Sequence, residues 1–345
     1  MLKIYLGVDV GSVSTNLVAL DSQLKVRETV YIRTMGHPVK ATQQGFKELQ
    51  SRLPQIEVLG VGATGSGRNL VAAMLGADEV KNEITAHAVA ATHFHPEVRT
   101  VFEIGGQDSK LILLRDGVVI DFAMNTVCAA GTGSFLDQQA LRLSIPIEEF
   151  GCWAARARQP VRIAGRCGVF AESDMIHKQQ MGYPTEEIIA GLCEALARNY
   201  LNNLGKGKEI LPPVVFQGGV AANLGLKLAF EKMLATEIMV PEYYNVMGAI
   251  GAALLAAESV KDRQSSFRGA DFILDGEFET RSMECNGCPN QCEVVSIHRQ
   301  GQVLAYFGDR CRRWDASLKS SKVVSRELKK TARQPVFKTR ERLSR

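Results

Sequence analysis

The sequence predicts an α/β protein of two lobes, followed by a small cysteine-rich extension and a basic tail. Three observations lead to this class. Strand-like apolar runs alternate with helical stretches, one strand–turn–strand pattern occurs twice, and four cysteines cluster near the C-terminus. We place the parts at residues 1–98 (first lobe), 99–258 (second lobe), 259–315 (extension) and 316–345 (tail).

The first lobe reads as strands and helices in alternation. We expect strands at Lys3–Val10, Asn16–Asp21, Lys25–Arg33 and Val58–Ala63, and helices at Pro38–Leu53, at Asn69–Leu75 and from Glu83 onward. The last of these helices carries His87 on a mostly apolar face. We therefore expect His87 to be a core histidine rather than a ligand.

An internal repeat links the two lobes. Thr100–Arg115 copies the pattern of Leu6–Asp21 with a shift of 94 residues. The shift superimposes Asp9 on Glu103, Gly11 on Gly105, Ser14 on Asp108 and Asn16 on Lys110. An acid at a strand end, followed by a Gly-rich turn, offers a carboxylate and backbone N–H groups, which suit Mg²⁺ and phosphate. Two such cradles facing each other would clamp a polyphosphate and Mg²⁺ between the lobes.

The second lobe ends with a further strand–turn–helix pattern. We expect strands at Lys208–Phe216 and Ile238–Val240, and helices at Val220–Leu234 and Val246–Ala257. The Gly218-Gly219 pair at the first strand–helix junction would let a flat ring or a ribose approach the backbone. Gly248 and Gly251 in the last helix would allow close packing against its neighbours.

Two cysteines stand in similar settings within the second lobe. Cys128 and Cys167, thirty-nine residues apart, each lie at or just before a predicted helix N-terminus. There the unpaired N–H groups and the helix dipole favour a thiolate, a disulfide-exchange centre or an anionic iron–sulfur cluster. A [4Fe–4S] cluster takes four thiolates, which a twofold dimer would supply. The alternative is that both are small buried residues.

The extension contains a four-thiolate pattern. Its spacing fits a tetrahedral site for Zn²⁺ or an iron–sulfur centre and does not separate the two. The alternative to a redox centre is a Zn²⁺ that only stabilises the fold of this small domain. The four thiolates are Cys285, Cys288, Cys292 and Cys311. We expect His298 not to be a ligand, and Cys152 and Cys193 to lie in the core.

The composition excludes several classes of protein. The formal net charge is +4, but residues 316–345 hold ten Lys or Arg against two Glu, so the rest of the chain is net acidic. A nucleic-acid role for the body therefore has no support. No run of 18 apolar residues predicts a membrane span, and the N-terminus reads as a strand rather than a signal peptide. We expect a cytoplasmic protein whose cysteines serve metal or redox chemistry.

Five segments, in this order, carry a family resemblance: NEITAHA, FEIGGQDSK, NTVCAAGTGSFLD, RCGVFAESDMI and GGVAAN. Together with the two cradles they resemble the actin, sugar kinase and heat-shock chaperone ATPase fold. Within that fold they resemble the ATP-dependent activators of 2-hydroxyacyl-CoA dehydratases. The ATPase subunits of benzoyl-CoA reductase and the reductases of double-cubane-cluster proteins belong to the same group. The resemblance covers Leu2–Ala257.

This resemblance implies an ATP-driven, low-potential electron donor. It implies a homodimer with one [4Fe–4S] cluster at the subunit interface, held by Cys128 and Cys167 of each chain. ATP hydrolysis would move the cluster-bearing helices and drive an electron into a partner iron–sulfur dehydratase or reductase. A ferredoxin or flavodoxin-like protein would supply that electron. Some longer members of the family carry a cysteine element similar to the extension.

The site residues follow from the cradles and from the resemblance. Asp9 and Glu103 are candidates to hold Mg²⁺, and Gln107 or Asp108 to orient the attacking water. We assign the nucleotide to Gly11, Ser12, Ser14, Thr15, Asn16, Gly105, Gly106, Lys110, Gly131, Gly133, Gly218, Gly219 and Asn223. Many relatives carry Lys where this chain has Asn16, and Lys110 would compensate. A small-molecule kinase of the same fold and a non-catalytic nucleotide switch are the alternatives.

Overall fold

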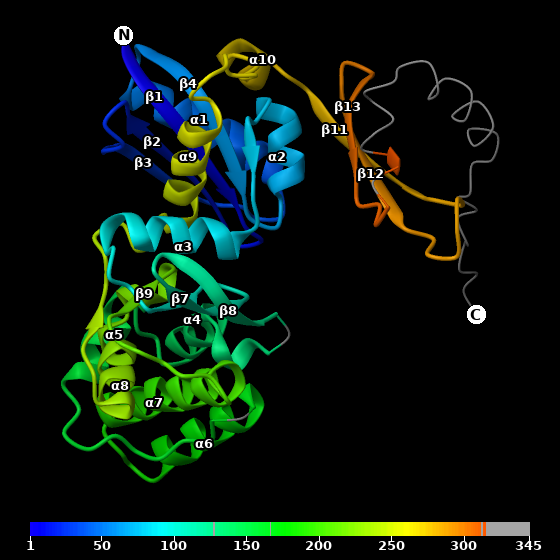
Figure 1. Ribbon diagram of the computed structural model, residues 1–345. Helices are drawn as coiled ribbons and strands as arrows, with labels where there is room; N and C mark the ends of the chain where they lie inside the picture. The colour runs from blue at the N-terminus through cyan, green and yellow to red at the C-terminus, as the bar shows by residue number, and fades with distance from the viewer. Residues whose placement is uncertain (127, 166, 312, 315–345) are drawn as a thin grey trace, which may run out of the picture. The chain divides into compact units, whose positions relative to one another are not determined.

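The computed structural model describes residues 1–126, 128–165, 167–311 and 313–314 (Figure 1). The chain divides into two compact units, and the boundary lies between Leu274 and Asp275. This boundary is later than the predicted one at residue 259. Residues 260–274 belong to the first unit because they are tied to the first lobe by hydrogen bonds, as described below.

The first lobe is built on a five-stranded sheet with the order β3-β2-β1-β4-β5. Its strands are β1 (Leu2–Val10), β2 (Ser14–Asp21), β3 (Val26–Arg33), β4 (Ile56–Thr64) and β5 (Glu79–Val80). The first three strands pair antiparallel, whereas β4 and β5 run parallel to β1. The helices are α1 (Pro38–Arg52), α2 (Arg68–Leu75) and α3 (Glu83–Phe94), and α3 lies between the two lobes (Figure 1).

The second lobe repeats this topology in a sheet with the order β10-β9-β6-β7-β8. Its strands are β6 (Thr100–Ile104), β7 (Ser109–Arg115), β8 (Val118–Asn125), β9 (Val214–Gln217) and β10 (Ile238–Met239). The helices are α4 (Gly133–Arg142), α5 (Ile147–Ala155), α6 (Gly168–Gln180), α7 (Thr185–Leu204) and α8 (Leu224–Leu234), whereas the following helix, α9 (Met247–Ser259), returns to pack against the first sheet. Two short 3-10 helices, η1 (Ala129–Gly131) and η2 (Gly219–Ala222), precede α4 and α8.

The strand registers confirm the repeat that the sequence predicts. Asp9 pairs with Asn16 across β1 and β2, and Glu103 pairs with Lys110 across β6 and β7. The shift of 94 residues therefore superimposes the pairs as well as the single residues. An Asp-Gly turn joins β7 to β8, and Asp116 and Gly117 both have the positive φ angles that such a hairpin turn requires.

Two predicted elements end or begin elsewhere. The strand expected at Lys208–Phe216 is confined to β9 because two prolines, which lack a backbone N–H, stand directly before it. The helix expected from Val220 begins only at Leu224. Asn223 caps that helix by accepting a hydrogen bond from the Leu226 N–H at 2.9 Å, and the preceding residues form η2.

Helix α9 holds the first sheet to α3. Its backbone approaches the strands so closely that a Cβ on Gly7 would lie 1.8 Å from the Ala249 carbonyl oxygen. A Cβ on Gly251 would lie 1.9 Å from the Ala86 carbonyl oxygen, so the expected tight packing of this helix is present. One apolar core cluster joins residues of both sheets through α3 and α9.

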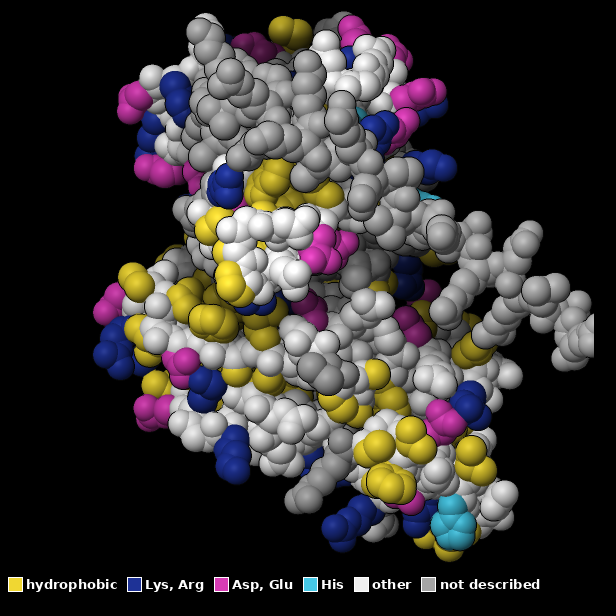
Figure 2. Space-filling model, turned by 90° about the vertical axis from the view of Figure 1, so that its right-hand side faces the viewer, with side chains coloured by type: hydrophobic (Ala, Val, Ile, Leu, Met, Phe, Trp, Pro, Cys, Tyr) yellow, Lys and Arg dark blue, Asp and Glu magenta, His cyan; other side chains and the backbone are white. Residues whose placement is uncertain are grey.

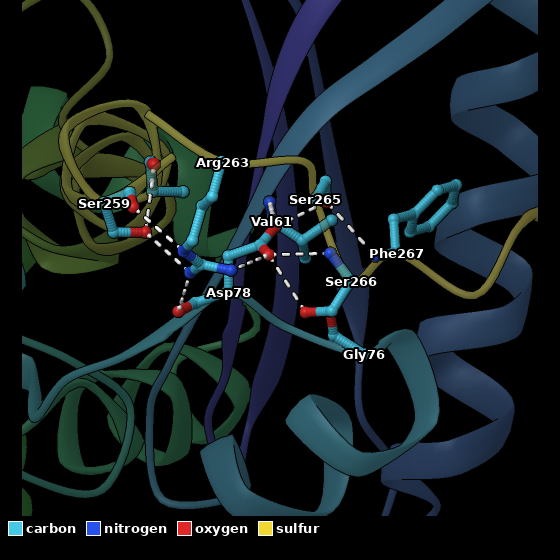
Figure 3. A network of polar contacts seen from close by, with 9 residues as sticks. Val61, Gly76, Asp78, Ser259, Arg263, Ser265, Ser266 and Phe267 are labelled. Carbon is cyan, nitrogen blue, oxygen red and sulfur yellow. Dashed lines mark hydrogen bonds and ion pairs between the residues drawn. The ribbon is translucent and has the colours of Figure 1, made fainter. Parts of the chain in front are cut away.

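Asp78 fastens the segment after α9 to the first lobe (Figure 3). Its side chain is fully buried and accepts hydrogen bonds from the Val61 N–H at 2.9 Å and the Ser266 N–H at 2.8 Å. The Ser265 hydroxyl donates at 2.5 Å, and Arg263 forms an ion pair at 3.1 Å. Burial alone would raise the pKa of Asp78, but these hydrogen bonds outweigh it and hold the pKa below its ordinary value.

The second unit contains an antiparallel three-stranded sheet. Its strands are β11 (Phe278–Glu284), β12 (Glu293–Arg299) and β13 (Gln302–Phe307), whereas the short helix α10 (Ala270–Leu274) closes the first unit. His298 shares a hydrogen bond of 2.9 Å with the Ser296 hydroxyl. Among the helices of the described residues, none combines the length and apolar character that a membrane crossing requires.

The Asp78 network leads to a prediction about stability. Asp78→Asn should lower the free energy of unfolding near neutral pH by about 1–3 kcal/mol, because several donors around a buried side chain lose their charged acceptor. The folded-state pKa is depressed, so this contribution is present above the ordinary value of 3.8 and disappears as the pH falls below it. Urea unfolding at neutral and acidic pH measures the difference.

The neighbouring Asp262→Asn serves as the control, since Asp262 is exposed. An equal loss of stability in Asp78→Asn at both pH values would contradict the electrostatic account.

Candidate active site

A cavity of about 470 Å³ opens between the two sheets. This volume lies in the range of small-ligand sites. Residues of both cradles and of the Gly218-Gly219 turn line it together. The predicted site residues found in its wall are Asp9, Gly11, Ser12, Ser14, Asn16, Glu103, Gly105, Gly106, Gln107, Asp108, Lys110, Gly133, Gly218, Gly219 and Asn223.

Two residues assigned to the nucleotide do not line this cavity. Thr15 is fully buried, and its hydroxyl shares a hydrogen bond of 3.0 Å with that of Thr34. Side chains alternate along β2, so Thr15 points away from the face that carries Ser14 and Asn16. Gly131 is buried in η1, where a Cβ would lie 3.0 Å from the Asn125 side-chain amide.

Asp9 is the acid of the first cradle, and its carboxylate is wedged between two glycines. A Cβ on Gly65 would lie 2.6 Å from Oδ1, and a Cβ on Gly248 would lie 2.2 Å from Oδ2. Burial raises the pKa of Asp9 to about 7, although the positive charge of Lys110 opposes this. A cation in the cavity would favour the ionised carboxylate, so the donor set suits Mg²⁺.

The second cradle contains a buried ion-pair cluster. Lys110 Nζ lies 2.8 Å from Glu103 Oε2 and 3.0 Å from Asp108 Oδ1, and its side chain is 4% exposed. Burial alone would lower the pKa of Lys110, but the two carboxylates outweigh it and raise the pKa. Lys110 therefore keeps a positive charge in the cavity wall, whereas the equivalent Asn16 in the first cradle has an amide oxygen with no described hydrogen-bond partner.

Backbone hydrogen bonds join the second cradle to the start of α4. The Gly133 N–H donates to the Gly105 carbonyl at 2.9 Å, and the Ser134 N–H donates to the Gly106 carbonyl at 2.9 Å. The Ser134 hydroxyl donates to the Gly106 carbonyl as well, at 2.5 Å. The same segment leads back through η1 to Cys128. Two backbone hydrogen bonds and one side-chain hydrogen bond therefore join the second cradle to the start of α4, which follows the turn after Cys128.

The two cysteine segments lie against each other. A Cβ on Gly168, the residue after Cys167, would be 3.8 Å from the Cβ of Ala130, two residues after Cys128. Both cysteines are half-buried. Asn125 braces the first of them, because its side chain both accepts from the Cys128 N–H at 3.0 Å and donates to the Cys128 carbonyl at 2.8 Å.

The helix settings of the two cysteines differ from each other. Cys167 stands at the N-cap of α6, as expected. Cys128 instead precedes the three-residue η1, and α4 begins only at Gly133. Both cysteines therefore stand at a helix N-cap, as expected, but the helix at Cys128 is a single short 3-10 turn that comes before α4. The Gly and Thr residues that follow Cys128 favour a turn over continuous helix.

Several cavity residues were not predicted from the sequence. They are Tyr31, Arg33, Gly65, Ser66, Glu83, His87, Thr126, Leu136, Asp137, Ile147, Glu148, Ala222, Asn245 and Gly248, together with the apolar Val13 and Val220. Glu83 and His87 are four residues apart on α3, so they share one helix face, and this spacing was a usable signal. His87 is buried, as expected of a core histidine, and it also lines the cavity, which was not predicted.

Cys152 and Cys193 were both expected to lie in the core, and the structure confirms this for one of them only. Cys193 is buried, and burial raises its pKa to about 12, as expected of a core thiol. Cys152 is exposed, because α5 turns that side of the helix to solvent.

In the extension, backbone pairing brings Cys285 and Cys292 together, with a 2.8 Å hydrogen bond from the Cys285 N–H to the Cys292 carbonyl. The Trp314 indole N–H donates to Cys285 Sγ at 3.4 Å and is the main cause of a lowered pKa at Cys285. Cys311 Sγ lies 3.7 Å from a carboxylate oxygen of Asp309. Within the described ranges, no three His, Cys, Asp or Glu side chains are grouped closely enough to hold a metal ion. The four-thiolate centre stays a prediction.

The fold and the cavity define an ATPase-type protein, in which two lobes of the same topology enclose a nucleotide-sized space lined by acids, glycines and a buried lysine. The chain belongs to the BadF/BadG/BcrA/BcrD ATPase family, whose sequence profile matches residues 6–256. The predicted actin-like ATPase fold is thereby confirmed.

Individual relatives agree with this membership. The chain is 34% identical to the (R)-2-hydroxyglutaryl-CoA dehydratase activating ATPase of Acidaminococcus fermentans, over 74% of this chain and 98% of the relative. It is 34% identical to the activator of lactoyl-CoA dehydratase of Anaerotignum propionicum, over 75% and 99%. A solved structure of the 2-hydroxyisocaproyl-CoA dehydratase activator of Clostridium difficile, with bound ADPNP, matches with 31% identity and a TM-score of 0.69, over 75% and 96%.

The cavity wall leads to a prediction about nucleotide binding. A Cβ on Gly219 would have the Tyr31 hydroxyl, at 3.9 Å, as its nearest neighbour, so the empty protein has room for it. Gly219→Ala should leave the unfolding temperature unchanged but raise the Kd for ATP about tenfold, because the methyl group enters the nucleotide's space. Calorimetric titration measures the Kd. An unchanged Kd would place the nucleotide elsewhere.

Proposed function

We propose that this chain is an ATP-dependent activator that couples ATP hydrolysis to the transfer of a low-potential electron into a partner metalloenzyme. Its relatives are named as activators of hydroxyacyl-CoA dehydratases and as a benzoyl-CoA reductase subunit. The partner would accordingly be a 2-hydroxyacyl-CoA dehydratase, a benzoyl-CoA reductase-like enzyme or a double-cubane-cluster protein. A ferredoxin or flavodoxin-like protein would deliver the electron to the activator.

The observation that carries this proposal is the direct link between the cavity and Cys128. The Gly105 and Gly106 carbonyls bind the first N–H groups of α4, and the segment before them carries the cysteine. A nucleotide whose terminal phosphate contacts the second cradle would act on that segment through two backbone hydrogen bonds.

The donor set fits a [4Fe–4S] cluster shared between two copies of the chain. Each chain offers two half-buried thiols on adjoining segments, so a twofold axis beside them would supply the four ligands that such a cluster takes. When bound, the cluster would accept and release one electron at a time. Cys128 and Cys167 would hold it, and Asn125 would fix the backbone at Cys128.

Exposed apolar side chains flank both cysteine segments. On β8, before Cys128, the exposed ones are Val118, Ile120, Phe122 and Met124, and on α6, after Cys167, they are Val169, Phe170 and Ile176. Figure 2 shows hydrophobic side chains on the surface of the second lobe, in the lower half of the view. Apolar surface of this kind is typical of protein contacts, which supports a homodimer and a docked partner.

The chemistry at the cavity follows from its charges. Asp9 and Glu103 would hold Mg²⁺ and its waters, and Lys110 would neutralise phosphate charge. Gln107 or Asp108 would orient the attacking water, since phosphoryl transfer to water needs positioning and charge neutralisation. The glycines and serines of the two cradles would bind phosphate oxygens, and Gly218, Gly219 and Asn223 would contact the nucleoside.

Iron content tests the cluster. Protein purified without oxygen should contain about four irons per dimer from this site, and either Cys128→Ala or Cys167→Ala should remove them. Cys152→Ala is the matched control and should keep the iron, because Cys152 is exposed and lies outside both segments. Retention of this iron in both single variants would contradict the proposed ligands.

The Ser134 hydroxyl tests the coupling. In cluster-free protein, the rate at which a thiol reagent modifies Cys128 should differ between ADP and a non-hydrolysable ATP analogue. Ser134→Ala removes one of the bonds to Gly106 and should shrink that difference several-fold. Ser173→Ala, which removes a hydroxyl bonded only within α6, is the control. If the modification rates with ADP and with the ATP analogue differ as much in Ser134→Ala as in wild type, the Ser134 hydroxyl does not couple the nucleotide to Cys128.

A further inference from the structure

His87 is the buried histidine of the nucleotide cavity. Its side chain is only 6% exposed, yet the residue lines the cavity wall. On the side away from the cavity, the Gln217 amide nitrogen lies 2.9 Å from His87 Nδ1 and 3.4 Å from the His87 carbonyl oxygen. Helix α3 therefore fixes one edge of the imidazole against β9 and leaves the other edge open.

These contacts determine which ring nitrogen carries the proton. A carbonyl oxygen only accepts hydrogen bonds, so the Gln217 group facing the His87 carbonyl must be the amide NH₂. The same NH₂ then donates to Nδ1, which must be the unprotonated nitrogen. The imidazole is held in the tautomer with its proton on Nε2. Burial, with a contribution from Lys110, lowers the pKa of His87 to about 3, which keeps the ring neutral.

The Nε2–H group of His87 and the carboxylate of Asp9 lie close to each other beside Gly248 of α9. A Cβ on Gly248 would lie 3.3 Å from His87 Nε2 and 2.2 Å from Asp9 Oδ2, so both atoms approach the same point of α9. No hydrogen bond to the Asp9 carboxylate is formed by any residue in the described part of the chain. The space between the two groups is thus bounded by one fixed donor and one acid, with Glu83, Glu103, Asp108 and Lys110 as the other charged groups facing it.

We propose that His87 is a positioning residue of the ATPase site, which donates Nε2–H to an oxygen bound beside Asp9 when the Mg²⁺–nucleotide complex is present. That oxygen belongs to a water or to the terminal phosphate. A neutral donor suits this place, because a charged imidazolium would compete with the cation for the same carboxylate. Gln217 acts through His87 by holding the tautomer. The inference rests on the proposed ATP hydrolysis but needs neither the cluster nor the electron-transfer partner.

Two substitutions separate this role from a packing role. The Asn side chain places its amide near the position of Nδ1, whereas the longer Gln side chain places its amide near the position of Nε2. His87→Asn should therefore keep the contact with Gln217 but lose the donor in the cavity, and kcat for ATP hydrolysis should fall at least about tenfold with little change in KM. His87→Gln should recover a large part of kcat.

His93→Gln, on the same helix but exposed, is the matched control and should behave as wild type. Thermal unfolding checks that each variant folds. Equal kcat values in folded His87→Asn and wild-type protein would overturn the proposal, as would equal losses of kcat in the Asn and Gln variants.

A spectroscopic measurement tests the geometry without reference to activity. The ¹⁵N shifts of the His87 ring in the full chain should report a proton on Nε2, and Gln217→Leu should weaken that preference. Adding Mg²⁺ with a non-hydrolysable ATP analogue should shift the Nε2 resonance more than Mg²⁺–ADP does. Nucleotide binding without any response at Nε2 would contradict this inference alone, whereas failure to bind nucleotide would contradict the proposed function as well.

Discussion

Two backbone hydrogen bonds, from the N–H groups of Gly133 and Ser134 to the carbonyls of Gly105 and Gly106, connect the nucleotide cavity to the rest of the second lobe. The first N–H groups of a helix have no partner within the helix and are usually satisfied by a capping side chain. At α4 the N-cap is Thr132, whose side chain makes no capping bond. The Gly105 and Gly106 carbonyls of the second cradle take that place, so the start of α4 is fixed by the cradle rather than by a cap.

The two walls of the cavity are built from equivalent parts of the internal repeat. In each lobe a strand ends in a glycine with a φ near +90°, Gly65 after β4 and Gly218 after β9. A Cβ at either position would lie 2.4 Å from a carbonyl oxygen of the neighbouring strand and less than 3 Å from the acid, Asp9 or Glu103. Only glycine suits that conformation and that closeness. Because both lobes have such a glycine beside the acid, Asp9 and Glu103 both face the same cavity.

The two halves of the repeat have diverged in charge. Glu103 has a buried lysine as its cross-strand partner, whereas Asp9 has Asn16, so only the second cradle pairs its acid with a cation across the strands. This asymmetry leaves Asp9 as the acid without an ionic partner on its own sheet. His87 approaches the same acid from α3 as a neutral group, which places a donor beside Asp9 without adding a charge there.

The sequence predicted what depends on local pattern. The repeat, the paired acids and the Gly218-Gly219 turn were all found from spacing, because strand ends and tight turns restrict residue types strongly. His87, Arg33 and Asp137 were missed, since their place in the cavity depends on packing between segments distant in the chain. The short 3-10 turn between Cys128 and α4 was not foreseen in detail, because a Gly-rich turn and a helix start look alike in sequence. The strand before Gln217 was drawn too long because the effect of the prolines was overlooked.

Hydrogen exchange at the start of α4 tests the central claim most directly. The amides of Gly133 and Ser134 should change their protection when ADP is replaced by a non-hydrolysable ATP analogue, and the change should extend to Ala129–Gly131 beside Cys128. If the nucleotide alters protection in the two cradles while the amides of Gly133, Ser134 and the turn after Cys128 stay the same, the cavity is not coupled to the cysteine, and the account fails.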